Sequence, residues 1–333
     1  MRILVTGGAG FIGSNLLLYL HEKYPNYQLL NIDKLSYASD LSYLDEIKHS
    51  NRYTFKKLDI VDRNAVRDII RSYKPDGVFH LAAESHVDNS IKGPEPFIQS
   101  NMVGTFNLIE ECRQFWKEDG EAWQNNRFLH VSTDEVYGEL GEQGAFSEES
   151  PYAPNSPYSA SKAGSDFIIR SYYHTYGMNV VTTNCSNNFG PHQHDEKLIP
   201  TVIRTALNQN DIPVYGKGEN VRDWLYVREH CRALDLVFNE GKSGETYIIG
   251  GNNEWKNIDL VEKICDILNE EVGDAPNSDF KNLITFVKDR PGHDFRYAID
   301  ASKIKEELGW DSQESFEQRL RETVRWYIRR YSE

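Results

Sequence analysis

The sequence predicts an α/β fold in which a doubly wound parallel sheet is followed by a smaller, mixed α/β C-terminal domain. Short apolar runs alternate with longer amphipathic stretches from residue 2 to residue 184. This rhythm is typical of a parallel sheet whose helices cover both faces. A glycine-rich segment at residues 7–13 joins the first apolar run to the first amphipathic stretch. After residue 190 prolines and glycines interrupt shorter elements, and this change predicts the second domain.

The individual elements follow from the same alternation. The predicted strands are Ile3–Thr6, Gln28–Ile32, Tyr53–Lys57, Gly77–Leu81, Arg127–Ser132 and Asn179–Asn184. The amphipathic stretches between them predict the helices Gly13–Lys23, Arg63–Tyr73, Ile98–Trp116 and Tyr158–Tyr176. Ligands of such sheets bind beyond the carboxyl ends of the strands, so the functional residues are expected there.

We assign residues 1–188 to the first domain and residues 189–333 to the second. The second half contains Tyr247–Gly250, which has the character of another short strand. Part of the segment at about residues 221–252 is therefore expected to pack back onto the first domain.

Composition excludes several classes of protein. The 333 residues carry 51 acidic and 37 basic side chains, for a net charge of −14, which argues against nucleic-acid binding. No apolar run approaches the roughly 18 residues of a membrane helix, and the N-terminus lacks the pattern of a signal peptide. Cys112, Cys185, Cys231 and Cys265 are scattered without the spacing of metal ligands. We expect a cytoplasmic protein with reduced cysteines and no metal site.

The glycine-rich segment has the pattern of a dinucleotide-binding loop. Gly7, Gly10 and Gly13 follow a predicted strand and precede a predicted helix. Glycines allow a sharp turn and a close approach of a pyrophosphate, which the helix N-terminus attracts. Asp33 ends the second strand, where its carboxylate can accept hydrogen bonds from both hydroxyls of a ribose and would repel a 2′-phosphate. The sequence therefore predicts NAD in preference to NADP, although the neighbouring Lys34 softens this preference.

Asp59 and Ile60 follow the third predicted strand, near the place where the adenine lies in this fold. The Asp59 carboxylate can bond the adenine amino group, or it can serve to cap a helix that begins near Asp62-Arg63. We favour the contact with the cofactor.

Tyr158 and Lys162 form a YxxxK pair on a predicted helix, where residues four positions apart share a face. A lysine ammonium beside a phenol favours the phenolate, so we expect the pKa of Tyr158 to be lowered enough for proton transfer near neutral pH. Such a pair is common by chance. It becomes specific beside the glycine loop and Ser132-Thr133, which ends the preceding strand.

Together these features resemble the extended short-chain dehydrogenases/reductases, and within them the nucleotide-sugar 4,6-dehydratases. The resemblance covers nearly the whole chain. It rests on the segments Gly7–Gly13, Leu81–Asp88, Ser132–Gly138, Tyr158–Lys162, Thr183–Pro191, Glu196–Pro200, Arg222–Val227 and Asp289–Asp294. It implies a Rossmann-type first domain, bound NAD, and a second domain that holds a nucleotide sugar.

The adjacent carboxyls of Asp134 and Glu135 separate a dehydratase from an epimerase. An epimerase needs only Thr133, Tyr158 and Lys162, whereas elimination across C5–C6 also needs a base for the C5 proton and an acid for the leaving hydroxyl. The residues alone do not decide which carboxyl has which role. The resemblance implies Asp134 as the acid and Glu135 as the base, with Tyr158 taking the proton of the 4-hydroxyl and a hydride moving from C4 to NAD and back to C6.

Three other functions stay open: a nucleotide-sugar 4-epimerase, a dehydrogenase that releases NADH, and a non-catalytic NAD-binding protein. Proteins of the last kind usually lack the tyrosine or the lysine. The resemblance implies dTDP-glucose as the substrate, with UDP-glucose or another nucleotide as the alternative. The bases of dTDP and UDP differ by one methyl group, and one methyl changes affinity by only about 1–3 kcal/mol.

The resemblance also implies two sets of binding residues. The cofactor set is Gly7, Gly10, Phe11, Ile12, Gly13, Asp33, Lys34, Ser36, Asp59, Ile60, Leu81, Ala82, Ala83, Ser100, Tyr158 and Lys162. The substrate set is Ser85, Thr133, Asn187, Lys197, Leu198, Pro213, Tyr215, Arg222, Asn257, Arg290 and His293. Arg222 and Arg290 are expected to clamp the diphosphate, because a guanidinium fork fits phosphate oxygens.

The chain departs from the family pattern in two places. The segment after Gly138, at residues 139–145, is shorter than in many bacterial members, and the chain ends soon after Arg325–Arg330, where longer members carry a tail that reaches the substrate. Both departures concern the rim of the nucleotide pocket. By analogy with relatives, the helices Ile98–Trp116 and Tyr158–Tyr176 are expected to form a four-helix interface in a homodimer.

Overall fold

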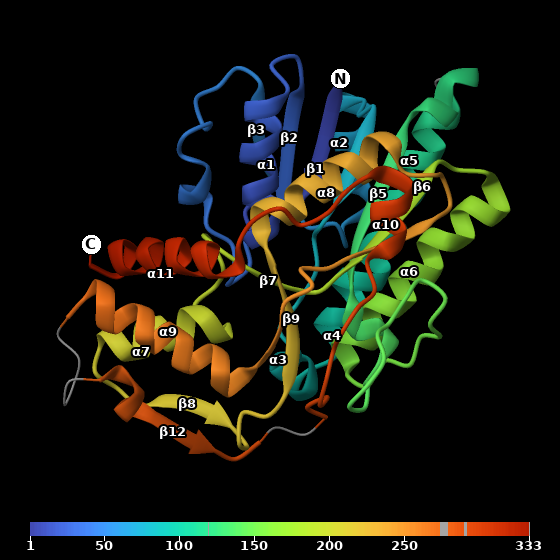
Figure 1. Ribbon diagram of the computed structural model, residues 1–333. Coiled ribbons are helices and arrows are strands. Elements are labelled where there is room, and N and C mark those ends of the chain that lie inside the picture. Colours follow the sequence, from blue (N-terminus) through green and yellow to red (C-terminus); the bar gives the residue numbers. More distant parts are fainter. Residues whose placement is uncertain (119, 274–278, 290–291, 333) are drawn as a thin grey trace.

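The computed structural model describes residues 1–118, 120–273, 279–289 and 292–332 (Figure 1). Its main feature is a seven-stranded parallel sheet in the order β10-β6-β5-β4-β1-β2-β3. The strands are β1 (Arg2–Thr6), β2 (Gln28–Asp33), β3 (Tyr53–Lys57), β4 (Gly77–His80), β5 (Arg127–Thr133), β6 (Val180–Cys185) and β10 (Thr246–Ile249). The strand order reverses between β1 and β4, and a ligand crevice opens beyond the carboxyl ends at such a point. The predicted Rossmann-type sheet is therefore confirmed.

Helices cover both faces of this sheet (Figure 1). The helices α1 (Phe11–Lys23) and α8 (Val227–Glu240) pack together on one face, and α2 (Arg63–Tyr73), α5 (Thr105–Glu118) and α6 (Pro157–Tyr176) pack on the other. In β1, Ile3 and Val5 belong to the apolar cluster that contains Leu16, while Leu4 belongs to the cluster that contains Trp116. Successive side chains of a strand point to opposite faces, so a strand covered on both sides is apolar throughout. This is why the strands are visible in the sequence as apolar runs.

The remaining strands form two small sheets, β11-β9-β7 and β12-β8. These strands are β7 (Asn187–Phe189), β8 (Ile212–Tyr215), β9 (Val221–Tyr226), β11 (Glu254–Lys256) and β12 (Ile284–Val287), and the helices beside them are α7 (Leu198–Leu207), α9 (Asn257–Glu271) and α11 (Phe316–Ser332). Shorter helical elements are η1 (Leu41–Leu44), α3 (Val87–Lys92), α4 (Glu95–Phe97), η2 (Ile98–Gly104), η3 (Glu121–Asn125), η4 (Asp134–Tyr137), η6 (Phe280–Leu283) and α10 (Ser302–Leu308).

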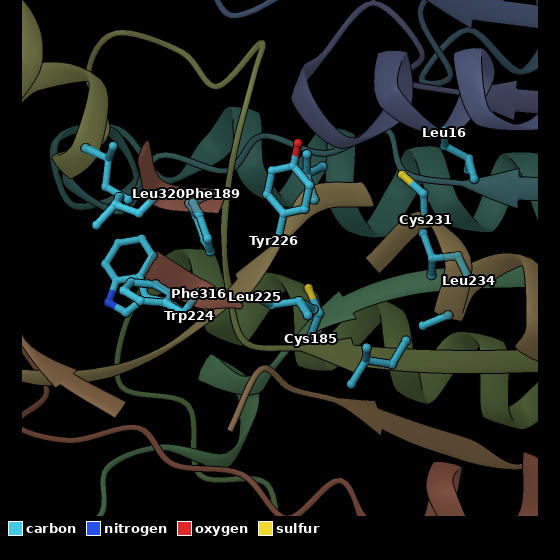
Figure 2. Packing of buried hydrophobic residues seen from close by; sticks show 14 of the residues in the cluster. Leu16, Cys185, Phe189, Trp224, Leu225, Tyr226, Cys231, Leu234, Phe316 and Leu320 are labelled. Atoms are coloured by element: carbon cyan, nitrogen blue, oxygen red, sulfur yellow. The ribbon is translucent and has the colours of Figure 1, made fainter. Parts of the chain in front are cut away.

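The two halves of the chain share one apolar core. Figure 2 shows Trp224 and Phe316 packed near Leu225, and the same buried cluster continues through Cys185 to Leu16 of α1. The strand expected at residues 247–250 is present as β10, which pairs in parallel with β6. The division into domains at residue 188 stays a prediction.

The helix that carries the YxxxK pair begins at a defined point. Ser156 precedes it and accepts a hydrogen bond from the Ser159 amide at 3.0 Å, while the Ser159 hydroxyl accepts one from the Ser156 amide at 3.0 Å. Pro157 occupies the first turn, where its missing N–H costs nothing. At the other end Gly177 takes a left-handed conformation with φ of 65°. These signals place Tyr158 in the first turn of α6.

The single helix expected over residues 98–116 is wrong in detail. The structure has a π-helix, η2, at residues 98–104, which continues into α5. In η2, Asn101 donates to the Glu84 carbonyl at 3.0 Å and to the Ser161 hydroxyl at 2.8 Å. Seven residues are too few for apolar spacing to separate a π-turn from an α-helix, and such turns are frequent at functional sites.

All four cysteines are buried and unbridged, as expected. Within the described part of the chain, no helix combines the length and the apolarity needed to span a bilayer.

Candidate active site

A pocket of about 290 Å³ lies beyond the carboxyl ends of the sheet strands, and it runs from the glycine loop to Tyr158. All of the residues expected to bind the cofactor line it, as do Thr133, Asp134 and Glu135. From the substrate set, Ser85, Thr133, Asn187 and Lys197 line it as well. One continuous pocket therefore holds both the dinucleotide loop and the predicted catalytic residues.

The geometry of the glycine loop fits a pyrophosphate. Gly7 has φ of 71°, and a Cβ there would lie 2.8 Å from the Cα of Ala82. A Cβ on Gly13 would lie 2.2 Å from the Gly7 carbonyl oxygen, so both positions require glycine. Gly10 precedes α1 without a side-chain cap, which leaves the N–H groups of the first helical turn for a ligand.

Asp33 is held at the end of β2 by three donors. Its carboxylate accepts hydrogen bonds from the Ala9 amide at 3.1 Å, the Leu35 amide at 2.8 Å and the Ser39 hydroxyl at 3.0 Å. It remains on the pocket wall, where the sequence analysis expects it to meet a ribose.

The ammonium of Lys34 is paired with a carboxylate that the sequence analysis missed. It lies 2.6 Å from Glu84 Oε1 and donates to the Ser100 hydroxyl at 3.0 Å. The positive charge beside Asp33 is therefore compensated within the protein, which removes the reason to expect Lys34 to favour NADP.

Asp59 does not cap α2. Asp62 does, since its carboxylate accepts a hydrogen bond from the Ala65 amide at 3.1 Å. The Asp59 carboxylate accepts one from the Val61 amide at 3.0 Å, and Asp59 lines the pocket. The capping alternative is wrong, and contact with an adenine stays a prediction.

The catalytic candidates meet where β5 ends and α6 begins. Thr133 ends β5, and Asp134 and Glu135 begin η4 directly after it. The Thr133 hydroxyl donates to Asp134 Oδ1 at 3.3 Å and accepts from the Glu135 amide at 3.3 Å. Tyr158 begins α6 close by, and the Thr133 hydroxyl favours the ionised form of its phenol.

The environment of Asp134 favours the protonated form of its carboxyl. Asp134 is only 2% exposed, and burial, followed by the negative charges of Glu135 and Asp223, holds its pKa well above the usual value. The charge of Arg222 opposes this rise, as does the hydrogen bond from Thr133. A neutral carboxyl beside a second carboxyl is the arrangement that a general acid requires.

The expectation of a lowered pKa for Tyr158 is wrong for this structure. Burial and the charge of Glu135 raise the pKa of Tyr158 well above its usual value. The Lys162 ammonium donates to the carbonyl of Val131 at 2.8 Å, and burial lowers the pKa of Lys162. The charge that was expected to stabilise the phenolate is held by a strand carbonyl, and desolvation dominates at the phenol.

A buried carboxylate that the sequence analysis missed lies behind the catalytic residues. Asp166 accepts hydrogen bonds from the hydroxyls of Ser132 at 2.8 Å and Tyr152 at 2.9 Å. It also accepts from Asn184 at 3.4 Å and lies 3.1 Å from His130 Nε2. Its position four residues after Lys162 on the same helix was the available signal.

Some of the substrate set lies outside the lining of this pocket. Pro213 and Tyr215 are exposed on β8, where the Tyr215 ring centroid is 6.1 Å from that of His293. Leu198 begins α7 and Asn257 begins α9. Arg290 lies outside the described residues. Lys197, which lines the pocket, donates to the Ser85 carbonyl at 3.2 Å.

The Arg222 side chain is buried, although it was expected to bind a diphosphate. It is 6% exposed, and its guanidinium donates to the carbonyls of Val221 at 2.7 Å and Asp294 at 2.8 Å. The guanidinium carbon lies 4.3 Å from the centroid of the Tyr297 ring. Among the described contacts its charge acts on Asp134, so its role on a diphosphate stays a prediction.

Comparison with known proteins places this geometry in a family. The family model described as GDP-mannose 4,6 dehydratase matches residues 4–323. A dTDP-glucose 4,6-dehydratase of Salmonella typhimurium is 52% identical over 338 residues, which cover 98% of this chain and 93% of the relative.

Two solved structures share the fold over the whole chain. A dTDP-glucose 4,6-dehydratase of Streptomyces venezuelae with NAD and TYD bound has a TM-score of 0.90 at 42% identity, covering 100% of this chain and 98% of that one. A UDP-glucose 4-epimerase of Thermotoga maritima has a TM-score of 0.86 at 28% identity, covering 100% of both chains.

Proposed function

The chain belongs to the family described as GDP-mannose 4,6 dehydratase, and within this family we propose that it converts dTDP-glucose to dTDP-4-keto-6-deoxyglucose with bound NAD. The reaction makes the protein a hydro-lyase. The single observation that carries the proposal is the buried carboxyl of Asp134, whose pKa is raised well above its usual value, next to Glu135 in the pocket that also contains Tyr158 and the glycine loop.

The pocket fits the cofactor. Gly7 and Gly13 have no Cβ, which would be crowded there, so the backbone N–H groups of the loop can approach the pyrophosphate. Asp33 lines the pocket, where its carboxylate can bind the adenosine ribose. The other cofactor residues of the sequence analysis line the same cavity. When bound, NAD supplies a hydride acceptor for C4 of the sugar and the donor that returns the hydride to C6.

We infer the following roles for the side chains. Thr133 holds the 4-hydroxyl of the sugar. Tyr158 takes its proton, for which the positive charge of bound NAD and the Lys162 ammonium would have to bring the raised pKa of the phenol back down. The resulting 4-keto group makes the C5 proton acidic, so that Glu135 can remove it. Asp134 then donates its proton to the hydroxyl that leaves C6 as water, and Glu135 returns its proton to C5. Lys162, anchored on Val131, orients the first turns of α6.

The epimerase alternative has support in the Thermotoga structure, but that enzyme class needs no acid for a leaving hydroxyl. An adjacent pair of carboxyls, one of them with a raised pKa, has no task in epimerisation. It has one in elimination, because each carboxyl serves one of the two proton transfers.

We further propose that the residues after about 188 hold the nucleotide, with Arg222 and Arg290 on the diphosphate side. Tyr215 is exposed on β8 and its ring lies beside that of His293, which supports this placement, since an aromatic surface suits a base. The nucleotide is dTDP in this proposal, and UDP is the alternative.

We also propose a cytoplasmic homodimer. Large apolar side chains are exposed on η2, α5 and α6, where a four-helix interface would cover them: Ile98, Phe106, Phe167 and Tyr176. Burial of such side chains against a second copy is the usual reason for an exposed aromatic patch. Absence of disulfides among the four cysteines accords with a reducing compartment.

The test is incubation of the purified protein with dTDP-glucose and, in parallel, UDP-glucose, followed by mass spectrometry of the sugar nucleotide. Loss of one water without accumulation of NADH is expected, and it should be faster with dTDP-glucose. Tyr158→Phe is the control, because it keeps the ring and removes the proton acceptor. A product of unchanged mass with the galactose configuration would replace the dehydratase with the epimerase.

A further inference from the structure

Two segments from different halves of the chain meet beside the cofactor pocket. One is the stretch of residues 34–40, which joins β2 to η1 without helix or strand and which we call the β2 loop. The other is residues 192–197, between β7 and α7, which we call the strap. Both line the pocket, the β2 loop through Lys34, Ser36, Ala38 and Ser39 and the strap through Gln193, His194, Glu196 and Lys197.

Glu196 joins the strap to the β2 loop. Its Oε1 atom accepts a hydrogen bond from the Tyr37 hydroxyl at 3.0 Å, and its Oε2 atom lies 3.6 Å from His86 Nε2. The Tyr37 ring meets the His194 ring edge to face, with the two centroids 5.3 Å apart. Burial, followed by the charge of Glu196, raises the pKa of Tyr37, so this phenol keeps its proton and is the donor at neutral pH.

The loop after β4, at residues 81–86, completes a ring of contacts. The Lys197 ammonium of the strap donates to the Ser85 carbonyl at 3.2 Å. The ammonium of Lys34 on the β2 loop lies 2.6 Å from Glu84 Oε1. The β2 loop, the strap and the loop after β4 are thus joined pairwise, and all three contribute residues to the lining of one pocket.

The strap is the fixed member of the Tyr37–Glu196 contact. Helix α11 holds it from behind, where the Tyr327 hydroxyl donates to the Gln193 carbonyl at 2.6 Å and the Tyr331 hydroxyl donates to Asp195 Oδ1 at 2.5 Å. Tyr37 by contrast is 48% exposed on a loop without regular structure. The β2 loop is therefore the part that can move away from the other.

The strap also rests on the element that would hold the pyrophosphate. His192 Nδ1 lies 2.9 Å from the hydroxyl of Ser14 in the first turn of α1, and the Pro191 carbonyl accepts a hydrogen bond from Asn15 at 3.0 Å. The β2 loop begins directly after Asp33, the residue expected at the adenosine ribose. The contact between the two segments therefore acts on the cofactor part of the pocket.

The strength of the Tyr37–Glu196 contact suits a device that opens. A hydrogen bond from a hydroxyl to a carboxylate is stronger than one between neutral groups. Partial exposure weakens it, since the Glu196 side chain is 22% exposed and Tyr37 is more exposed still. Such a bond holds a loop in place for most of the time and still breaks reversibly.

We propose that Glu196 is a latch that holds Tyr37 and the β2 loop closed over bound NAD. The cofactor leaves only after the Tyr37–Glu196 hydrogen bond breaks and the β2 loop moves away from the strap. This inference rests on the proposed function, in which NAD is reduced and reoxidised within one cycle and gains nothing by leaving. Tyr37 and Glu196 are positioning residues in this role, because they control the exchange of NAD and transfer no proton.

The test measures the release of NAD from the purified full chain. Each protein is loaded with isotope-labelled NAD, mixed with excess unlabelled NAD and filtered at intervals, and the labelled NAD that stays bound is measured by mass spectrometry. Tyr37→Phe keeps the ring against His194 and removes the hydroxyl, and Glu196→Gln keeps the shape and removes the charge. Each should accelerate release by about threefold to tenfold, because a partly exposed hydrogen bond to a charged group is lost or weakened.

The double variant shows whether the two residues act through one contact. Tyr37→Phe combined with Glu196→Gln should release NAD no faster than the faster single variant, because both substitutions remove the same interaction. Tyr24→Phe is the matched control. It removes a hydroxyl that donates to the Asp235 carboxylate at 3.0 Å, away from the pocket lining, and it should leave the release rate unchanged. Circular dichroism confirms the fold of each variant.

Two results overturn the latch. One is a release rate equal to that of the wild type in both single variants. The other is a double variant in which the two accelerations multiply, since the residues would then act separately. Failure of the proposed function is a different result, because the wild-type protein would then release no water from dTDP-glucose while its exchange of NAD could still be measured.

Discussion

The carboxylate of Asp166 accepts a hydrogen bond from the Ser132 hydroxyl at 2.8 Å, one residue before Thr133. Asn184 donates to the same carboxylate at 3.4 Å and to the Thr133 carbonyl at 3.1 Å. A buried carboxylate on α6 thereby holds the ends of β5 and β6 in fixed positions relative to Lys162. The catalytic set depends on this shared acceptor as well as on its own residues.

Replacement of Asp166 by Asn should impair both stability and turnover. The amide offers one acceptor oxygen and two new N–H groups where hydroxyl and amide donors converge, so the protein should lose about 2–4 kcal/mol of unfolding free energy. The charge of Asp166 opposes the lowering of the Lys162 pKa, and its loss should move the alkaline limit of activity to lower pH. Urea unfolding and the pH profile of kcat measure the two effects. Ser132→Ala, which removes one hydrogen bond, should cost about 1 kcal/mol and leave the pH limit in place.

Replacement of Asp134 by Asn should slow turnover and stabilise the fold. Loss of the general acid should reduce kcat by about 10²–10⁴-fold. The folded-state pKa of Asp134 lies above its unfolded value of 3.8, so the folded protein binds more protons and wild-type stability falls as pH rises through the interval between the two values. An Asn side chain carries no charge, so the stability of the variant does not fall over this pH interval. Thermal unfolding should therefore show Asp134→Asn more stable than wild type at pH 7 and equal to it below about pH 4. Equal stability at pH 7 would mean that the carboxyl is ionised without penalty.

Two alanine substitutions in the glycine loop should separate folding from cofactor binding. In Gly13→Ala the new Cβ would lie 2.2 Å from the Gly7 carbonyl oxygen, so the backbone must move and stability should fall by about 1–3 kcal/mol. In Gly10→Ala the Cβ meets only that oxygen, at 3.3 Å, and otherwise enters the pocket. Gly10→Ala should fold normally and carry several-fold less NAD. Thermal melting and the NAD released on denaturation give the two readings, and a normal NAD content in Gly10→Ala would contradict the placement of the pyrophosphate.

A charge on the exposed face of α6 should weaken the proposed dimer. Phe167 is 58% exposed, and Phe286 on β12 is 59% exposed but lies away from η2, α5 and α6. Phe167→Asp should shift the protein toward monomer by sedimentation velocity, because a buried unpaired carboxylate costs several kcal/mol in an apolar interface. Phe286→Asp is the matched control and should leave the assembly unchanged. A dimer that survives Phe167→Asp would place the interface elsewhere.

Much of the fold was predictable because it depends on local patterns. The apolar runs of β1, β2, β4, β5 and β6 are buried on both faces, whereas β3 is an edge strand, and the Ser156-Pro157 start of α6 is a local signal. The π-turn of η2 was not predictable, because its seven residues have no apolar spacing distinct from that of an α-helix. The pairing of Lys34 with Glu84 joins residues 50 positions apart, and no local pattern indicates it.

The sequence by itself determined the order of the first six sheet strands, the dinucleotide loop, and the residue types Thr133, Asp134, Glu135, Tyr158 and Lys162 that meet at one sheet edge. These follow from spacing and from the rule that parallel strands end at a common edge. Only the tertiary structure decided the electrostatic environment of these groups: the pKa values of the Asp134 carboxyl and the Tyr158 phenol are raised, and the Lys162 ammonium donates to the Val131 carbonyl. The reason is that a pKa depends on burial and on charges brought close by the whole fold, and these distances are absent from the order of residues.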